Sequence, residues 1–166
     1  MDNNYLQATN KMMRIMCVGD SITVGVGTQT NYRAPLGERL RAIAANTAFV
    51  GPYNDTMTSE ASQCAAISGI WAKTVNESYI VHWTTASQPD IALVHLGTND
   101  IFNGASVNSV IDALSGTITK MRNIMPSIKI YMAQIIGTTN TLVNSKIVEL
   151  NQRIAQLVQN TFTAAS

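Results

Sequence analysis

Apolar residues along this chain follow two patterns: short continuous runs, and longer stretches in which they recur every three or four positions. The stretch 14–20 holds four apolar or thiol residues in succession, and 91–96 is apolar except for one histidine. Such runs are typical of strands buried on both faces of a parallel sheet. A short stretch at 47–51 and a longer apolar stretch at 129–136 predict two further strands.

The periodic stretches predict helices. Pro35 opens the first of them, with apolar residues on one face at helical spacing. The pattern predicts further helices over 70–81, 106–124 and 143–160. The stretch 52–68 is polar and irregular, and we expect a long loop there, a kind of segment that is more often functional than idle in a compact domain.

The alternation of strands and helices predicts an α/β fold, a parallel sheet with helices on both faces. Right-handed crossovers would bring the carboxyl ends of the strands to one edge, where open sheets bind ligands. With 166 residues, the chain suits one domain with a proper core. We expect an N-terminal leader at 1–12 and a single domain at 13–166.

Composition narrows the classes of function. The net charge is +1 with no basic cluster, which argues against nucleic acid or an anionic membrane surface as a partner. Cys17 and Cys64 make neither a metal-binding pattern nor a disulfide framework. No apolar run approaches the roughly 18 residues that span a membrane, and the N-terminus lacks the apolar middle of a secretory signal. We therefore expect a soluble protein that is either intracellular or has lost a leader.

Polar residues gather where three predicted segments end. The clusters are Gly19-Asp20-Ser21, Ser68-Gly69 and Gly97-Thr98-Asn99-Asp100. Gly19 allows a sharp turn after the first strand, so Ser21 either faces a ligand at the sheet edge or caps the next helix. The glycines that follow do not have the spacing of a phosphate-binding loop.

Together these clusters suit nucleophilic catalysis by a serine. Such a serine needs a base to take its proton and donors to hold the oxyanion of the substrate. The backbone N–H groups of Ser21 and Gly69 and the side-chain amide of Asn99 could converge as donors. We interpret Asp20 and Asp100 as braces that hold the turns.

The motifs resemble the first three blocks of the SGNH, or GDSL, hydrolases, over about residues 14–155. Further details resemble carbohydrate esterase family three, the acetyl xylan esterases. These details are Tyr32-Arg33, Phe49-Val50-Gly51, Pro89-Asp90, His95 and Asn151.

The resemblance implies a flavodoxin-like three-layer α/β/α sandwich. It implies Ser21 as the nucleophile and Ser21, Gly69 and Asn99 as the oxyanion hole. Tyr32 and Arg33 are then expected to bind substrate. The implied reaction is hydrolysis of small acyl esters, often acetyl groups on sugars, with no metal or cofactor.

One block of that family is missing from these 166 residues. The family has a further strand followed by Asp-x-x-His, which supplies the base and its orienting carboxylate. The two histidines present are His82, expected to be a plain surface or packing residue, and His95, expected to be buried, neutral and hydrogen-bonded. Loss of one triad member typically leaves roughly 10³–10⁴-fold acceleration over water, so we expect weak hydrolysis unless a base comes from elsewhere, such as a neighbouring subunit. A truncated chain is the simplest explanation.

The missing strand would otherwise cover the strand predicted at 129–136. An apolar strand with one unpaired edge tends to pair with another chain, so we expect a homo-oligomer through this edge.

Two alternatives to a serine esterase remain. One is a non-catalytic relative that binds acylated carbohydrate without cleaving it. The other is an unrelated flavodoxin-like nucleotide or flavin module, which the absence of a phosphate-binding loop disfavours. Trp71 and Trp83 are expected in the core, although either could line a sugar site.

Overall fold

The computed structural model describes residues 11–25, 31–43, 45–54 and 63–163. The predicted leader at 1–12 falls almost wholly outside them. The strands are β1 (Met13–Gly19), β2 (Thr47–Val50), β3 (Tyr53–Asn54), β4 (Gln63–Ala66), β5 (Ile91–His95) and β6 (Lys129–Met132). The helices are α1 (Ser21–Val24), α2 (Arg33–Ala42), α3 (Ala72–Thr74), the π-helical η1 (Val75–Tyr79), α4 (Ile80–Ser87), α5 (Thr98–Phe102), α6 (Val107–Ile124) and α7 (Thr141–Thr163).

Strand β1 lies at the centre of the sheet, whose order is β3-β4-β1-β5-β6. One edge of β1 is shared: its first half pairs with β2 and its end pairs with β4. Its other edge pairs with β5 along the whole of that strand, so that Gly19 lies opposite His95. All these pairings are parallel, and only β3–β4 is antiparallel among the described strands.

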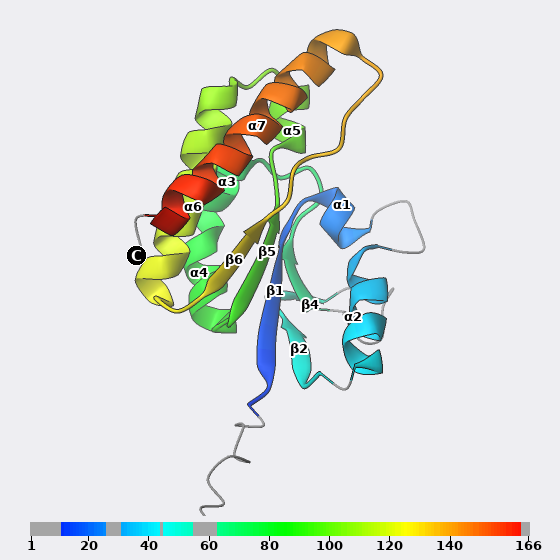
Figure 1. Cartoon of the computed structure of the whole chain (residues 1–166), viewed down its shortest axis with the longest axis vertical. Coiled ribbons are helices and arrows are strands. Elements are labelled where there is room, and N and C mark those ends of the chain that lie inside the picture. Colours follow the sequence, from blue (N-terminus) through cyan, green and yellow to red (C-terminus); the bar gives the residue numbers. More distant parts are fainter. Residues whose placement is uncertain (1–10, 26–30, 44, 55–62, 164–166) are drawn as a thin grey trace, which may run out of the picture.

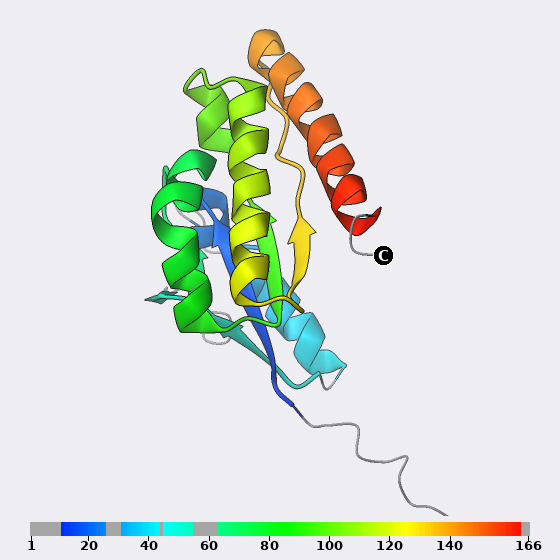
Figure 2. The ribbon, with the colours of Figure 1, turned by 90° about the vertical axis from the view of Figure 1, so that its left-hand side faces the viewer.

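Helices cover both faces of the sheet, which confirms the predicted α/β fold. The helices from α3 to α4, with α6 and α7, pack on one face, where Met16 and Val18 of β1 point (Figures 1 and 2). Helix α2 packs on the other face against Ile15 and Cys17. The alternate side chains of β1 thus enter two separate cores, which explains why its sequence is apolar without alternation.

Strand β4 corrects the prediction of a loop over 52–68. Its sequence, Gln-Cys-Ala-Ala, carries no β-branched or aromatic residue and so gives no strand signal. Pairing with the end of β1 forms the strand, and burial of Cys64, Ala65 and Ala66 follows. Residues 55–62 of the predicted loop lie outside the described part of the chain.

Two other elements differ in length from the prediction. The helix predicted over 70–81 extends through α3, η1 and α4 to Ser87. The strand predicted at 129–136 ends at Met132, because beyond Ala133 the backbone turns to helix α7. There the Asn151 side chain receives a hydrogen bond from Ile135 N and donates one to Ile135 O.

The α2 face of the sheet is covered unevenly. Helix α2 lies beside β2 and β4 at the right of Figure 1, whereas β6 lies on the opposite side of the sheet, beyond β1 and β5. Tyr131 of β6 is 58% exposed, and among the described strands β6 pairs only with β5. No described helix is long and apolar enough to cross a membrane.

Candidate active site

The turn after β1 places Ser21 at the carboxyl edge of the sheet. Gly19 has no room for a side chain, since a Cβ atom there would lie 2.0 Å from Thr23 Oγ1. Asp20 adopts extended backbone and caps α1, accepting a hydrogen bond from Ile22 N at 3.0 Å. Ser21 is the first residue of α1 and is half-buried.

The end of β4 comes beside this turn. Ile67 N donates to Gly19 O at 3.2 Å, which links the two strand ends. Gly69 follows with φ +76°, a conformation that side-chain-bearing residues rarely adopt. A Cβ atom at Gly69 would meet no atom within 4 Å, so its backbone borders open space.

The turn after β5 joins the other two through Asn99 and Asp100. Asn99 Nδ2 lies 3.2 Å from Asp20 Oδ2 and 3.1 Å from Ile70 O. Asp100 is buried, and its Oδ2 accepts a hydrogen bond from Ala72 N at 2.9 Å. The structure therefore brings the three polar clusters together at one edge, with Asp20 and Asp100 holding the backbone.

These bonds also occupy Asn99. An amide NH₂ group has two hydrogens, and each has a protein acceptor in this arrangement. An oxyanion at this place would share Asn99 with Asp20 or Ile70 O.

Burial controls the ionisation of the groups around this edge. It raises the pKa of Asp20, while the Ile22 N–H and the nearby His95 lower it in part. Burial likewise raises the pKa of Asp100, against the hydrogen bond from Ala72 N. Burial lowers the pKa of His95 below its usual 6.5, although the charge of Asp20 opposes this, so that His95 is neutral at pH 7.

His95 is 9% exposed, as expected for a buried histidine. The expectation that its side chain is hydrogen-bonded is wrong for the nitrogen Nδ1. Its Nδ1 is buried with no hydrogen-bond partner among the described residues. His82 lies exposed on α4. Within the described part of the chain, neither histidine is hydrogen-bonded to Ser21, and no group of three or more His, Cys, Asp or Glu side chains could bind a metal.

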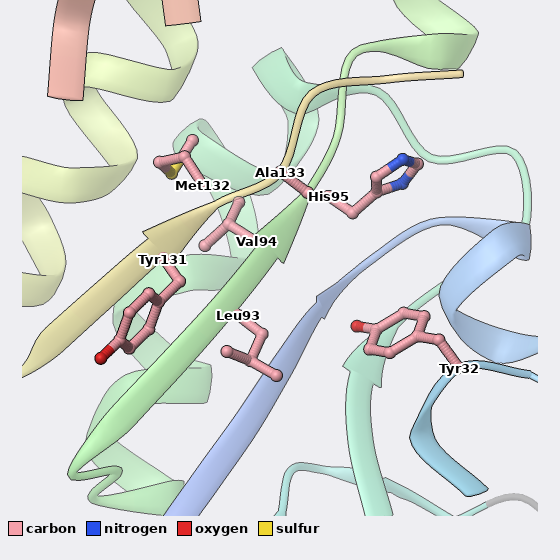
Figure 3. A pocket seen from close by; sticks show the side chains of 7 residues that line it. All are labelled: Tyr32, Leu93, Val94, His95, Tyr131, Met132 and Ala133. Atoms are coloured by element: carbon pink, nitrogen blue, oxygen red, sulfur yellow. The ribbon is translucent and has the colours of Figure 1, made fainter. Parts of the chain in front are cut away.

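A pocket of about 320 Å³ opens on the part of the sheet that α2 leaves uncovered (Figure 3). Its walls are mainly apolar side chains of β5 and β6. The lining residues are Tyr32, Leu93, Val94, His95, Tyr131, Met132 and Ala133. His95 lies where β5 ends and Tyr32 faces the pocket from the segment before α2, so the pocket adjoins the carboxyl edge (Figure 3).

The two residues expected to bind substrate have different surroundings. Tyr32 lines the pocket, with its hydroxyl 3.5 Å from Thr23 Oγ1, and burial raises its pKa. Arg33 is fully buried, and its Nε donates to Thr23 O at 3.0 Å. The Arg33 guanidinium also reaches Val24 O and Gln63 O at 3.5 Å, so it braces α1 against β4 rather than facing solvent.

The tryptophans also differ. Trp83 is in the core as expected, stacked on Tyr79. Trp71 is 37% exposed at the sheet edge, so the expectation of a core position is wrong for it. Its apolar neighbours in the sequence gave no sign of this exposure.

Comparison with known proteins identifies the protein family to which this chain belongs. A sequence model of the GDSL-like lipase/acylhydrolase family matches residues 17–165, and the chain belongs to this family. It is therefore a carboxylic ester hydrolase by family, and the alternative of an unrelated nucleotide or flavin module is wrong. No curated protein matches the chain in a sequence search.

Among solved structures, a carbohydrate esterase family 3 protein from Talaromyces cellulolyticus is 26% identical, with a TM-score of 0.79. The match covers 90% of this chain and 73% of that one. A mutant acetyl esterase with an acetate ion has 26% identity, the same coverage and a TM-score of 0.78. A family 3 carbohydrate esterase from Clostridium thermocellum, at 24% identity and TM-score 0.77 over 93% of this chain and 74% of its own, shares the fold.

Proposed function

We propose that the chain hydrolyses small acyl esters, acetyl esters of carbohydrates among them, with Ser21 as the nucleophile. The observation that carries this proposal is the convergence of three strand ends: Asn99 Nδ2 contacts both Asp20, next to Ser21, and Ile70, next to Gly69. The similarity to an acetyl esterase and to a carbohydrate esterase supports the substrate class.

In this reaction the Ser21 Oγ attacks the ester carbonyl carbon and loses its proton to a base. The carbonyl oxygen becomes an oxyanion, which accepts hydrogen bonds from the N–H groups of Ser21 and Gly69 and from Asn99 Nδ2. Collapse of this intermediate expels the alcohol, which takes up a proton, and leaves an acyl-serine. Water then attacks the acyl group and releases the acid and free Ser21.

Positioning falls to residues that do not react. Asp20 caps the helix that begins with Ser21, and Asp100 fixes the backbone between Gly69 and α3. Tyr32 borders the pocket and would contact a bound ester there. Arg33, which the resemblance would assign to substrate, acts instead through the backbone of α1.

Removal of the Ser21 proton by a base is the step for which these 166 residues offer the weakest candidates. They contain no Asp-x-x-His, His82 is exposed on α4, and His95, which lines the pocket where β5 ends, is kept neutral by burial, which lowers its pKa. We expect weak turnover from this chain alone, with roughly 10³–10⁴-fold acceleration over water from binding and the oxyanion hole.

The same observation favours a second candidate, a non-catalytic module that binds acylated carbohydrate. Hydrolysis of p-nitrophenyl acetate decides between the two. The esterase predicts turnover above the buffer rate that Ser21→Ala abolishes. Absence of turnover in both forms, with sugar-ester binding unchanged by Ser21→Ala, would establish the module instead.

Two further features belong to the proposal. The chain forms one domain over residues 13–166, and its β6 edge pairs with a second copy, because that strand lacks a partner on one side among the described residues. Light scattering at high concentration tests the pairing. A strictly monomeric protein would contradict it.

A further inference from the structure

Two large aromatic side chains are exposed near Asn99. Trp71 is 37% exposed and precedes α3, and Phe102, at the end of α5, is 53% exposed. Both helices lie at the end of the sheet where β1 and β5 terminate (Figure 1). Exposed aromatic groups at a candidate site point to ligand binding more than isolated ones elsewhere.

The backbone on both sides of Trp71 is bonded to the turn that holds Asn99. Ile70 O accepts from Asn99 Nδ2 at 3.1 Å, and Ala72 N donates to Asp100 Oδ2 at 2.9 Å. Ile70 and Ala72 are both buried, whereas Trp71 between them has extended backbone, with φ −96° and ψ 148°. Since successive side chains alternate in extended backbone, the indole points outward.

Phe102 reaches the same surface by helical spacing. It lies three residues after Asn99 on α5, and residues three apart share a helix face. Asp100 and Ile101, by contrast, are buried toward the interior. Asn99 is therefore flanked by Trp71 through the Ile70 bond and by Phe102 through α5.

The surroundings of these aromatic residues suit a sugar ring better than an acyl chain. Ser68 and Gly69 are exposed beside Trp71, and Gly69 borders open space. A pyranose ring has apolar C–H faces, which pack on an aromatic ring, and a rim of hydroxyl groups, which stay in water or bond to amides. An acyl chain would find its apolar walls in the pocket beside Leu93 instead.

We infer that Trp71 and Phe102 form an aromatic platform that binds the sugar ring of an acylated carbohydrate at the oxyanion edge. The platform makes the chain prefer sugar esters to simple alkyl esters. This inference rests on the proposed function for the location of the ester group at Ser21.

Binding is tested first, without turnover, in the Ser21→Ala protein. Calorimetry with methyl mono-O-acetyl-xylopyranoside should show Trp71→Ala weakening the affinity by about tenfold and Phe102→Ala by about threefold. Trp71→Phe keeps an aromatic face and should lose less than Trp71→Ala. Val81→Ala is the matched control, because Val81 is 51% exposed, close to the 53% of Phe102, but lies on α4 away from the pocket, and it should leave the affinity unchanged.

Kinetics with Ser21 intact separate this inference from the proposed function. Trp71→Ala should raise the KM for the acetylated xyloside and leave the KM for ethyl acetate unchanged. Trp71-dependent binding without any hydrolysis would overturn the esterase but keep the platform. No binding of the xyloside, or equal binding by the parent and the folded Trp71 variants, would overturn the platform even if ethyl acetate is hydrolysed. Equal melting temperatures establish that a variant is folded.

Discussion

The centre of the sheet and its β6 edge differ in how completely their polar groups are hydrogen-bonded. Around β1, β4 and the end of β5, backbone and side-chain hydrogen bonds join three loops. Both carboxylate oxygens of Asp20 and Oδ2 of Asp100 accept hydrogen bonds there. On the β6 side, the strand edge lacks a partner among the described residues, Tyr131 is exposed and an apolar pocket stands open.

This difference separates two requirements of catalysis, stabilisation of the oxyanion and removal of the proton from Ser21. The residues that would stabilise an oxyanion, which are Ser21, Gly69 and Asn99, belong to the closely bonded region. Among the residues that the structure describes, none in that region is placed to remove the proton from Ser21. The only buried histidine, His95, lies at the junction of the two regions with Nδ1 unpartnered among the described residues. The predictions below test whether the two regions act independently.

The largest expected effect comes from Asn99→Ala. Removing one oxyanion donor typically lowers kcat by roughly 10²–10³-fold, and here the link to Asp20 and Ile70 O is lost as well. Measurement of ester hydrolysis by the purified variants checks this.

Asn103→Ala is the matched control for Asn99. Asn103 Nδ2 donates to Asn99 O, but Asn103 is exposed and its side chain makes no described contact with the other two loops. We expect less than about a threefold change, the size of a lost exposed hydrogen bond. Equal losses in both variants would mean that α5, rather than the Asn99 amide, is what matters.

Replacing the two glycines of the closely bonded region with alanine should lower the free energy of unfolding by different amounts. Gly19→Ala places a methyl group 2.0 Å from Thr23 Oγ1 and 3.1 Å from His95 O, so we expect a loss of roughly 1–3 kcal/mol in the free energy of unfolding. Gly69→Ala meets no atom within 4 Å and should cost about 1 kcal/mol for its positive φ alone.

Urea unfolding of both glycine variants measures this contrast. Gly69→Ala also places a methyl group where an ester would approach, so it should lower ester hydrolysis more than stability. A Gly69→Ala protein that is the less stable of the two would show that the β4 end is as crowded as the β1 turn.

The pH dependence of stability isolates His95 at the junction. Its folded-state pKa lies below the usual 6.5, so its contribution to stability is present above pH 6.5 and is lost as the pH falls through the lowered value. Asp20 and Asp100 act oppositely. Their raised pKa values give stability that is present below pH 3.8 and lost as the pH rises through the folded-state values.

His95→Gln should therefore remove the acid-side loss near and below pH 6.5 and leave the Asp100 effect in place. Because His95 lowers the pKa of Asp20 in part, the Asp20 effect should move to higher pH in the variant. Urea midpoints of the parent and the variant, measured from pH 8 to pH 4, check this. A difference between the two proteins that does not change over this range would contradict the assigned sign.

The smallest effect is expected at the β6 edge. Tyr131→Lys changes an exposed side chain, so the free energy of unfolding should move by less than about 0.5 kcal/mol. A charge on an edge strand disfavours pairing, so the variant should be more monomeric by light scattering than the parent. An unchanged oligomeric state would place any contact between copies elsewhere.

Local patterns allowed much of the fold to be predicted. The apolar runs of β1 and β5, the helical periodicity of α6 and the glycines that end both strands mark elements whose signal lies in neighbouring residues. The same holds for the residue types at the candidate site, because Gly-Asp-Ser and Gly-Thr-Asn-Asp directly follow the strands that position them.

The partners of those residues could not be predicted, since they lie far apart in the sequence. Strand β4 exists through pairing with β1, and Arg33 is buried because backbone carbonyls of α1 and β4 surround its guanidinium. Trp71 is exposed because the bonds of its two neighbours to Asn99 and Asp100 turn them inward.

The sequence by itself thus determined that two buried strands end in turns that carry a serine and an asparagine. Only the tertiary structure decided that Asn99 bonds to Asp20, across 79 positions, and that both of its amide hydrogens are engaged. The physical reason is range: turns and periodicity depend on residues a few positions apart, whereas hydrogen bonds between loops depend on the register of the whole sheet.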